Sequence, residues 1–172
     1  ERPAADHRRI ARASSRRLVE TALLSLATPF LTQSRLRTIL QAAPSLEAAV
    51  QRQQDDGAPM LITSAHMAYW EVQTCIPLLV PAPFPEMGVI FRPVGKPALD
   101  AWVKRSRERF GLRLLSRKEG FQEALKILRR RGIVGVLFDQ NAGLQGALTT
   151  LFGRVCSTTE LPGLLAEKFG AR

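Results

Sequence analysis

One histidine and one carboxylate in the sequence have a spacing that fits acid–base chemistry. His66 follows the short apolar run Met60–Thr63, and Glu71 lies five residues after His66. A carboxylate on one imidazole nitrogen fixes the tautomer and supports the other nitrogen as a general base. The two side chains can meet if His66 lies in a loop and Glu71 early in a helix. On one continuous helix they would point about 140° apart, and the alternative is a capping histidine beside an exposed glutamate.

Polar residues also follow two other predicted strands. Arg92 follows the run Gly88–Phe91, and Asp139 and Gln140 follow the apolar run Ile133–Phe138. Functional side chains in α/β proteins gather at the carboxyl ends of parallel strands. Taken singly, each of these residues also fits a turn or a surface position. Together with His66 they indicate a shared site, in which the planar guanidinium of Arg92 would suit a phosphate.

Other catalytic patterns are absent from the sequence. It contains no Gly-x-Ser-x-Gly elbow of the serine hydrolases and no Gly-x-Gly-x-x-Gly loop. The two histidines, His7 and His66, are far apart, and the two cysteines, Cys75 and Cys156, do not form a Cys-x-x-Cys pair. We therefore predict neither a metal site nor a cofactor.

Length and hydrophobic periodicity predict one domain of the α/β class. The chain has 172 residues, of which 45% are hydrophobic and 23% charged, as in ordinary globular proteins. Residues 1–56 are predicted to be helical, and residues 57–172 alternate between apolar runs and amphipathic segments. We expect strands near 60–63, 88–91, 112–115 and 133–138, and helices near 67–79, 99–110 and 121–128. This alternation favours a largely parallel sheet. The chain does not begin with Met, and we expect it to be a fragment.

The basic residues are unevenly distributed. The net charge is +10, and 13 basic residues against four acidic ones lie between Arg92 and Arg131. Such an excess predicts a polyanionic partner, which could be nucleic acid, anionic lipid or an acidic protein. A nucleic-acid-binding module is the less favoured alternative, because aromatic residues make up only 6% of the chain and no docking motif is recognisable.

Several blocks of the sequence resemble the lipid A biosynthesis acyltransferases, a family of the lysophospholipid acyltransferase-like superfamily. Residues 65–71 are similar to the family's Gly-His-Phe-Gly-Asn-Trp-Glu block, although Ala65, Ala68 and Tyr69 replace its two glycines and its asparagine. Phe91-Arg92-Pro93 and Lys96–Asp100 resemble its Tyr-Arg-Pro and Asn-Pro-Ala-Leu-Asp segments. Arg109–Leu112, Arg129–Gln140 and Phe152-Gly153-Arg154 with Ser157–Thr159 match in the same order.

The resemblance implies a fold and a reaction. The fold would be a glycerol-3-phosphate-acyltransferase-like αβα sandwich, preceded by N-terminal helices, in one acyltransferase domain over residues 1–172. The reaction would move a fatty acyl chain from a thioester, on acyl carrier protein or CoA, to a hydroxyl of a lipid A precursor or a related glycolipid. His66 would be the base, and Glu71 would orient it. Substrate-binding roles would fall to Arg92, Asp139, Gln140 and Arg154.

The resemblance also implies partners and a location. The basic segment Arg92–Arg131 would attract acidic carrier protein or an anionic membrane surface, and not nucleic acid. We expect the protein at the cytoplasmic face of a bacterial inner membrane, either peripheral or anchored by a segment outside this chain. Because the loop around His66 departs from the family pattern, the alternative is a degenerate acyltransferase fold that binds lipid without turnover.

Overall fold

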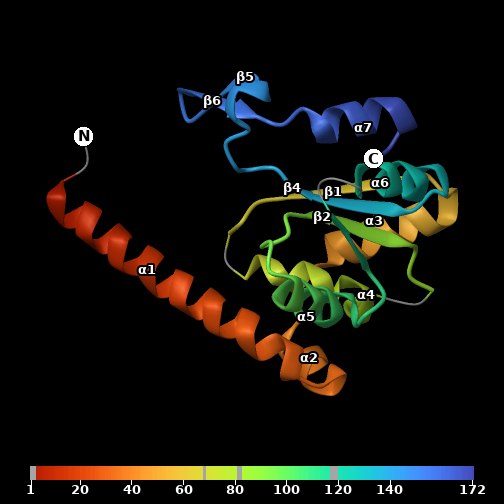
Figure 1. Ribbon diagram of the computed structural model, residues 1–172, viewed down its shortest axis with the longest axis horizontal. Coiled ribbons are helices and arrows are strands. Elements are labelled where there is room, and N and C mark those ends of the chain that lie inside the picture. Colours follow the sequence, from red (N-terminus) through yellow and green to blue (C-terminus); the bar gives the residue numbers. More distant parts are fainter. Residues whose placement is uncertain (1–2, 68, 81–82, 117–119) are drawn as a thin grey trace.

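The computed structural model describes residues 3–67, 69–80, 83–116 and 120–172. A run of helices precedes an α/β body, as the sequence predicts (Figure 1). The helical part contains α1 (Ala4–Ala27), the 3₁₀ helix η1 (Thr28–Phe30), α2 (Gln33–Ile39) and α3 (Pro44–Asp56). The hydroxyl of Thr32 caps α2 by accepting the backbone N–H of Arg35 at 3.2 Å. Pro44 begins α3, and Gly57 ends it in the left-handed conformation.

Four parallel strands form the central sheet. They are β1 (Met60–Ser64), β2 (Met87–Phe91), β3 (Arg113–Ser116) and β4 (Ile133–Leu137), in the spatial order β1-β4-β2-β3. The predicted α/β class and parallel sheet are thus confirmed. Ser64 is the register partner of Leu137, and Phe91 is the partner of Ser116. All four carboxyl ends consequently lie along one edge of the sheet, which we call the carboxyl edge, and the four amino ends lie along the opposite, amino edge.

Helices cover both faces of the sheet, because neighbouring strand residues point to opposite sides. Val89 packs in a cluster with residues of α3, α4 (Ile76–Leu79) and α5 (Pro97–Glu108), whereas Ile90 packs against α6 (Gly120–Arg129) and α7 (Leu161–Phe169). Gly88 allows α6 to approach closely, since a Cβ there would lie 2.6 Å from the Cδ1 atom of Ile127. The result is the expected αβα sandwich (Figure 1).

Two regions differ from the sequence-based expectation. The helix predicted at 67–79 is instead the 3₁₀ helix η2 (Trp70–Cys75) followed by the short α4. Pro77 lacks a backbone N–H and is tolerated in the first turn of an α-helix, so α4 begins at Ile76. Beyond β4 the sequence predicted no elements. The structure adds η3 (Gly143–Gln145), the antiparallel hairpin of β5 (Ala147–Leu151) and β6 (Arg154–Thr158), and α7.

No helix within the described residues is long and apolar enough to cross a bilayer.

Candidate active site

The register of β1 and β4 brings His66 and Asp139 together. Ser64 and Leu137 are paired at the ends of these strands, and His66 and Asp139 each lie two residues further on. The backbone N–H of Phe138 donates to the Ser64 carbonyl at 3.1 Å and extends the pairing beyond the strands. Asp139 Oδ1 lies 2.7 Å from His66 Nδ1, and Asp139 Oδ2 accepts the His66 backbone N–H at 2.8 Å. The carboxylate therefore holds both the ring and the backbone of His66.

The protonation of this pair follows from its hydrogen bonds. Partial burial by itself raises the pKa of Asp139, but the hydrogen bonds from the His66 ring and from the His66 backbone outweigh it and hold the pKa below its ordinary value. Asp139 is thus an acceptor at neutral pH, and Nδ1 of His66 carries the shared proton. The other ring nitrogen, Nε2, makes no hydrogen bond within the described residues. Both side chains are 33% exposed, so a substrate can reach them.

Trp70 packs against the imidazole of His66. The two ring centroids are 5.2 Å apart, and the rings meet edge to face at 67°. The indole of Trp70 also contacts Arg107, whose guanidinium carbon lies 5.4 Å from the ring centroid in a cation–π arrangement. Arg107 in turn donates to both carboxylate oxygens of Glu71, at 2.6 and 3.3 Å. An ion pair between η2 and α5 thus supports the indole that packs against His66.

This geometry contradicts the predicted contact between Glu71 and His66. The carboxylate on the His66 ring belongs to Asp139, and the carboxylate of Glu71 binds Arg107. The cause is local, because residues 70–75 form a 3₁₀ helix and the second residue of that helix, Glu71, faces α5. The Glu71 and Arg107 side chains are only 14% and 19% exposed, so this is a mostly buried structural pair. Ala68, which departs from the family pattern, lies outside the described residues.

Arg92 lies at the carboxyl edge, in the loop after β2. It is exposed and makes no hydrogen bond or ion pair with any residue that the structure describes, which leaves its guanidinium available to a bound anion. Asp100 on α5 shapes this loop by accepting the backbone N–H groups of Val94 at 2.8 Å and Gly95 at 3.0 Å. Sequence reasoning assigned Asp100 no role. The sequence did contain a signal for this role, because Asp100 is an acid in the first turn of a predicted helix and directly follows a loop that contains a glycine.

Two other predicted substrate-binding residues stay apart from the His66–Asp139 pair. Gln140 is exposed next to Asp139 and its side chain makes no hydrogen bond within the described part of the chain. Arg154 begins β6 and is paired with Leu151 near the tip of the exposed hairpin. Neither side chain makes a hydrogen bond or ion pair with His66 or Asp139. The roles of Gln140 and Arg154 in substrate binding remain predictions.

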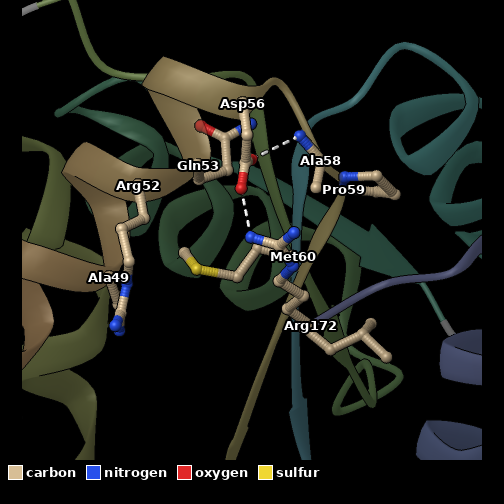
Figure 2. A pocket seen from close by; sticks show the side chains of 9 residues that line it. Ala49, Arg52, Gln53, Asp56, Ala58, Pro59, Met60 and Arg172 are labelled. Atoms are coloured by element: carbon tan, nitrogen blue, oxygen red, sulfur yellow. Dashed lines mark hydrogen bonds and ion pairs between the residues drawn. The ribbon is translucent and has the colours of Figure 1, made fainter.

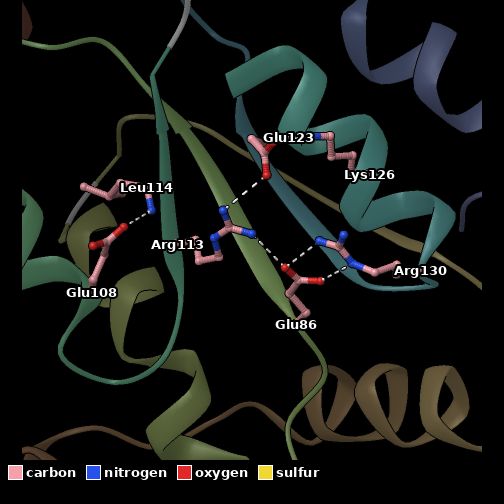
Figure 3. Close-up of polar contacts among 7 residues, drawn as sticks. All are labelled: Glu86, Glu108, Arg113, Leu114, Glu123, Lys126 and Arg130. Carbon is pink, nitrogen blue, oxygen red and sulfur yellow. Dashed lines mark hydrogen bonds and ion pairs between the residues drawn. The ribbon is translucent and has the colours of Figure 1, made fainter. Parts of the chain in front are cut away.

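The basic segment Arg92–Arg131 does not form one field at the site. Arg113 and Arg130 bind Glu86 at the amino edge, each at 2.9 Å, and Arg113 also binds Glu123 at 3.2 Å (Figure 3). Arg109 donates to the backbone carbonyls of Thr28, Pro29 and Leu31 at 2.7 to 3.0 Å. Arg129 and Arg131 also lie at the amino edge, just before β4. Of the described basic side chains, Arg92 and Lys96 border the loop at the carboxyl edge, whereas residues 117–118 lie outside the described ranges.

A cavity of about 440 Å³ lies away from this site, at the amino end of β1 (Figure 2). Arg172 forms an ion pair with Asp56 at its wall, and Gln53 donates from Nε2 to the Arg131 carbonyl at 2.5 Å. Because it lies at the amino edge, this cavity is not part of the candidate active site. Among the described residues, no group of three or more His, Cys, Asp or Glu side chains is arranged to hold a metal ion.

Comparison with known proteins points to one family. The sequence model of the family described as bacterial lipid A biosynthesis acyltransferase matches residues 1–172. A comparison with curated proteins gives no match.

Proposed function

Because the chain belongs to the bacterial lipid A biosynthesis acyltransferase family, we propose that it moves a fatty acyl chain from an acyl thioester to a hydroxyl of a lipid A precursor or related glycolipid. The observation that carries this proposal is the hydrogen-bonded pair of His66 and Asp139, in which Nε2 of His66 makes no hydrogen bond to any described residue. A neutral imidazole held by a carboxylate is a general base for a hydroxyl nucleophile.

The reaction uses this pair in two steps. Nε2 of His66 takes the proton of the acceptor hydroxyl as its oxygen attacks the thioester carbonyl. Asp139 holds the ring in place and stabilises the imidazolium that forms. When the tetrahedral intermediate collapses, the carbon–sulfur bond breaks and the imidazolium returns its proton to the leaving thiolate. The products are the new ester and the free thiol of the carrier, and no acyl-enzyme is needed.

Arg92 supplies positive charge at the same edge of the sheet. In this proposal its guanidinium binds a phosphate of the acceptor lipid or offsets the charge of the developing oxyanion. The donor is acyl carrier protein or acyl-CoA, and the reaction takes place at the cytoplasmic surface of a bacterial inner membrane. The loop geometry set by Asp100 supports this role, because it fixes the backbone that carries Arg92.

A transfer assay tests the proposal. The full-length protein is incubated with a phosphorylated lipid A precursor and with a lauroyl or myristoyl thioester, either on carrier protein or on CoA. Lipid mass spectrometry should show an acceptor that is heavier by one ester-linked chain. His66→Ala is the inactive control, and Arg129→Gln, at the amino edge, is the active one. A folded protein that binds the acceptor but forms no ester with either donor would contradict the proposal and favour lipid binding without turnover.

A further inference from the structure

Tyr69 connects the loop of His66 to the helical part of the protein. Its hydroxyl is hydrogen-bonded to the hydroxyl of Thr28, the first residue of η1, across 41 positions of the chain. Thr28 is only 8% exposed, and Tyr69 is half-buried. Tyr69 is the only tyrosine of the chain, and it stands where the family block has asparagine, whose side chain lacks the ring that spans this gap. The connection therefore comes from a departure of this chain from the family pattern.

The direction of this hydrogen bond follows from the number of protons available. The Thr28 hydroxyl donates its one proton to the Leu24 carbonyl at 2.6 Å, so its oxygen accepts the proton of Tyr69. Burial raises the pKa of Tyr69 above its ordinary value, against the lowering effect of the bond to Thr28, so the phenol keeps its proton at neutral pH. Two hydrogen bonds thus run in series from Tyr69 through Thr28 to Leu24, and such bonds strengthen each other.

The end of α5 holds both partners of the bond between Tyr69 and Thr28. Arg109, which directly follows α5, donates to three backbone carbonyls between positions 28 and 31 at 2.7 to 3.0 Å and so fixes η1. Two residues earlier, Arg107 donates to both carboxylate oxygens of Glu71 and so fixes η2. These contacts close a ring through η1, α5 and η2. The phenol is therefore held from both sides.

η2 carries Trp70 next to this bond. Tyr69 directly precedes η2, and Gln73 within η2 donates from Nε2 to Ser64 Oγ at 2.6 Å, at the end of β1. Trp70 lies between these two attachments, and its ring centroid is 5.2 Å from that of His66. A release of Tyr69 from Thr28 would free the start of η2, which is the end that carries the indole.

We propose that Tyr69 is a positioning residue for His66: its hydrogen bond to Thr28 fixes the start of η2, so that Trp70 keeps the imidazole in the orientation that acyl transfer requires. Asp139 holds the ring through Nδ1, and the indole restricts rotation about that hydrogen bond. The inference rests on the proposed acyl transfer for its kinetic consequence only, because the environment of the ring can be measured without substrate.

A spectroscopic measurement on the full-length protein reports on the ring directly. Histidine labelled with ¹³C at Cε1 gives one NMR signal for each histidine, and the signal of His66 is the one absent from His66→Ala. The ring current of the indole shifts this signal, and Trp70→Leu shows its position without the indole. Tyr69→Phe, which keeps the aromatic ring and removes the hydroxyl, should move the His66 signal toward that position.

Acyl-transfer kinetics give a second readout. Tyr69→Phe should lower kcat by about tenfold and leave KM unchanged, since a misplacement of about 1 Å can cost up to ~10²-fold in rate. Thr28→Val removes the acceptor and should have the same effect, whereas Thr28→Ser keeps the hydroxyl and should restore both kcat and the NMR signal.

Thr38→Val is the matched control. The Thr38 hydroxyl donates to a carbonyl of its own helix, that of Arg35, at 2.7 Å, and makes no other hydrogen bond within the described residues. Its removal should leave kcat and the His66 signal unchanged. Melting temperatures of the same preparations show that each variant is folded.

Two outcomes would overturn the proposal. The first is a His66 signal that stays in its native position in folded Tyr69→Phe and Thr28→Val, even if both variants are less stable, because the bond would then be structural only. The second is a displaced signal with native kcat. If the native protein forms no ester with either donor, the proposed function fails, and the NMR comparison alone decides whether Tyr69 positions the ring.

Discussion

Each edge of the central sheet holds a carboxylate that is bound to a basic side chain, yet only one edge has the means for proton transfer. At the carboxyl edge, Asp139 binds the imidazole of His66. At the amino edge, Glu86 binds the guanidinium groups of Arg113 and Arg130 (Figure 3). Arginine stays charged at every pH a protein meets, whereas imidazole gains and loses its proton near neutrality.

The pKa shifts of the two carboxylates do not distinguish the edges. The hydrogen bond from Arg130, with further help from Arg113, holds the pKa of Glu86 below its ordinary value. Asp139 also has a lowered pKa, through its bonds to His66 and against the effect of burial. A perturbed carboxylate is therefore a weak indicator of function here, and the titrating partner and the open Nε2 of His66 are the informative features.

The largest expected effect is at the carboxyl edge. His66→Ala removes the base and should lower the rate of acyl transfer by about 10²–10⁴. Because the ring is one-third exposed, the melting temperature should change little. Steady-state kinetics and thermal denaturation on the same preparation measure both quantities. Near-native transfer by this variant would remove His66 from the reaction.

Asp139→Asn should be the next most damaging change to activity. The amide cannot stabilise the imidazolium and favours the wrong tautomer, so we expect a rate loss of about 10² or more. In the native protein the rate should fall in acid, because a protonated imidazole cannot take the proton of the acceptor hydroxyl. Asp139 itself stays ionised in mild acid, because its pKa is lowered. Glu71→Gln is the comparison, and an equal rate loss in a Glu71→Gln protein of native stability would restore Glu71 as the partner of His66.

The sequence predicts those parts of the site that depend on residues close together in the chain, and it fails for contacts between residues that are far apart in the chain. The apolar runs at 60–63 and 133–138 are local, and they predicted β1, β4 and the strand ends that carry His66 and Asp139. The pairing of these strands is not local. The order β1-β4-β2-β3 places β4 next to β1, which makes Ser64 and Leu137 neighbours and gives His66 a partner 73 residues away. Periodicity contains no information on strand order, so Glu71, which is near in sequence, was assigned instead.

The same limit explains why the arrangement of the basic segment Arg92–Arg131 was not predicted. Its count of charges was available from the sequence, but its division between the two edges was not, because Glu86 meets Arg130 across 44 positions and Arg109 meets Thr28 across 81.

The hairpin of β5 and β6 was missed for another reason. Its strands are mostly exposed on both faces, so they show no alternation of buried and exposed positions from which a strand could be predicted.

The mostly buried pair beside the site should matter for stability more than for chemistry. Glu71→Ala leaves the Arg107 guanidinium without its partner in a region where both side chains are less than one-fifth exposed. We expect a loss of about 3 kcal/mol in the free energy of unfolding, measured by denaturant titration. In a double-mutant cycle with Arg107→Ala, the two losses should be clearly non-additive. Additive losses would mean that the pair is not coupled.

The smallest effect is expected at the amino edge, from Glu86→Gln. The side chains of Glu86, Arg113 and Arg130 are 33%, 46% and 52% exposed, so solvent screens the ion pairs and we expect the free energy of unfolding to fall by no more than about 1 kcal/mol. Because the folded-state pKa of Glu86 is lowered, its contribution is present above the ordinary carboxyl pKa and is lost as the pH falls through the lowered value. The variant and the native protein should therefore differ at pH 7 and converge in acid, with unchanged acyl transfer throughout. Glu167→Gln, an exposed acid on α7, controls for the loss of one charge and should match the native protein at both pH values. A difference for Glu86→Gln that persists in acid, or a lower rate of transfer, would show that the two edges are not as independent as their contacts indicate.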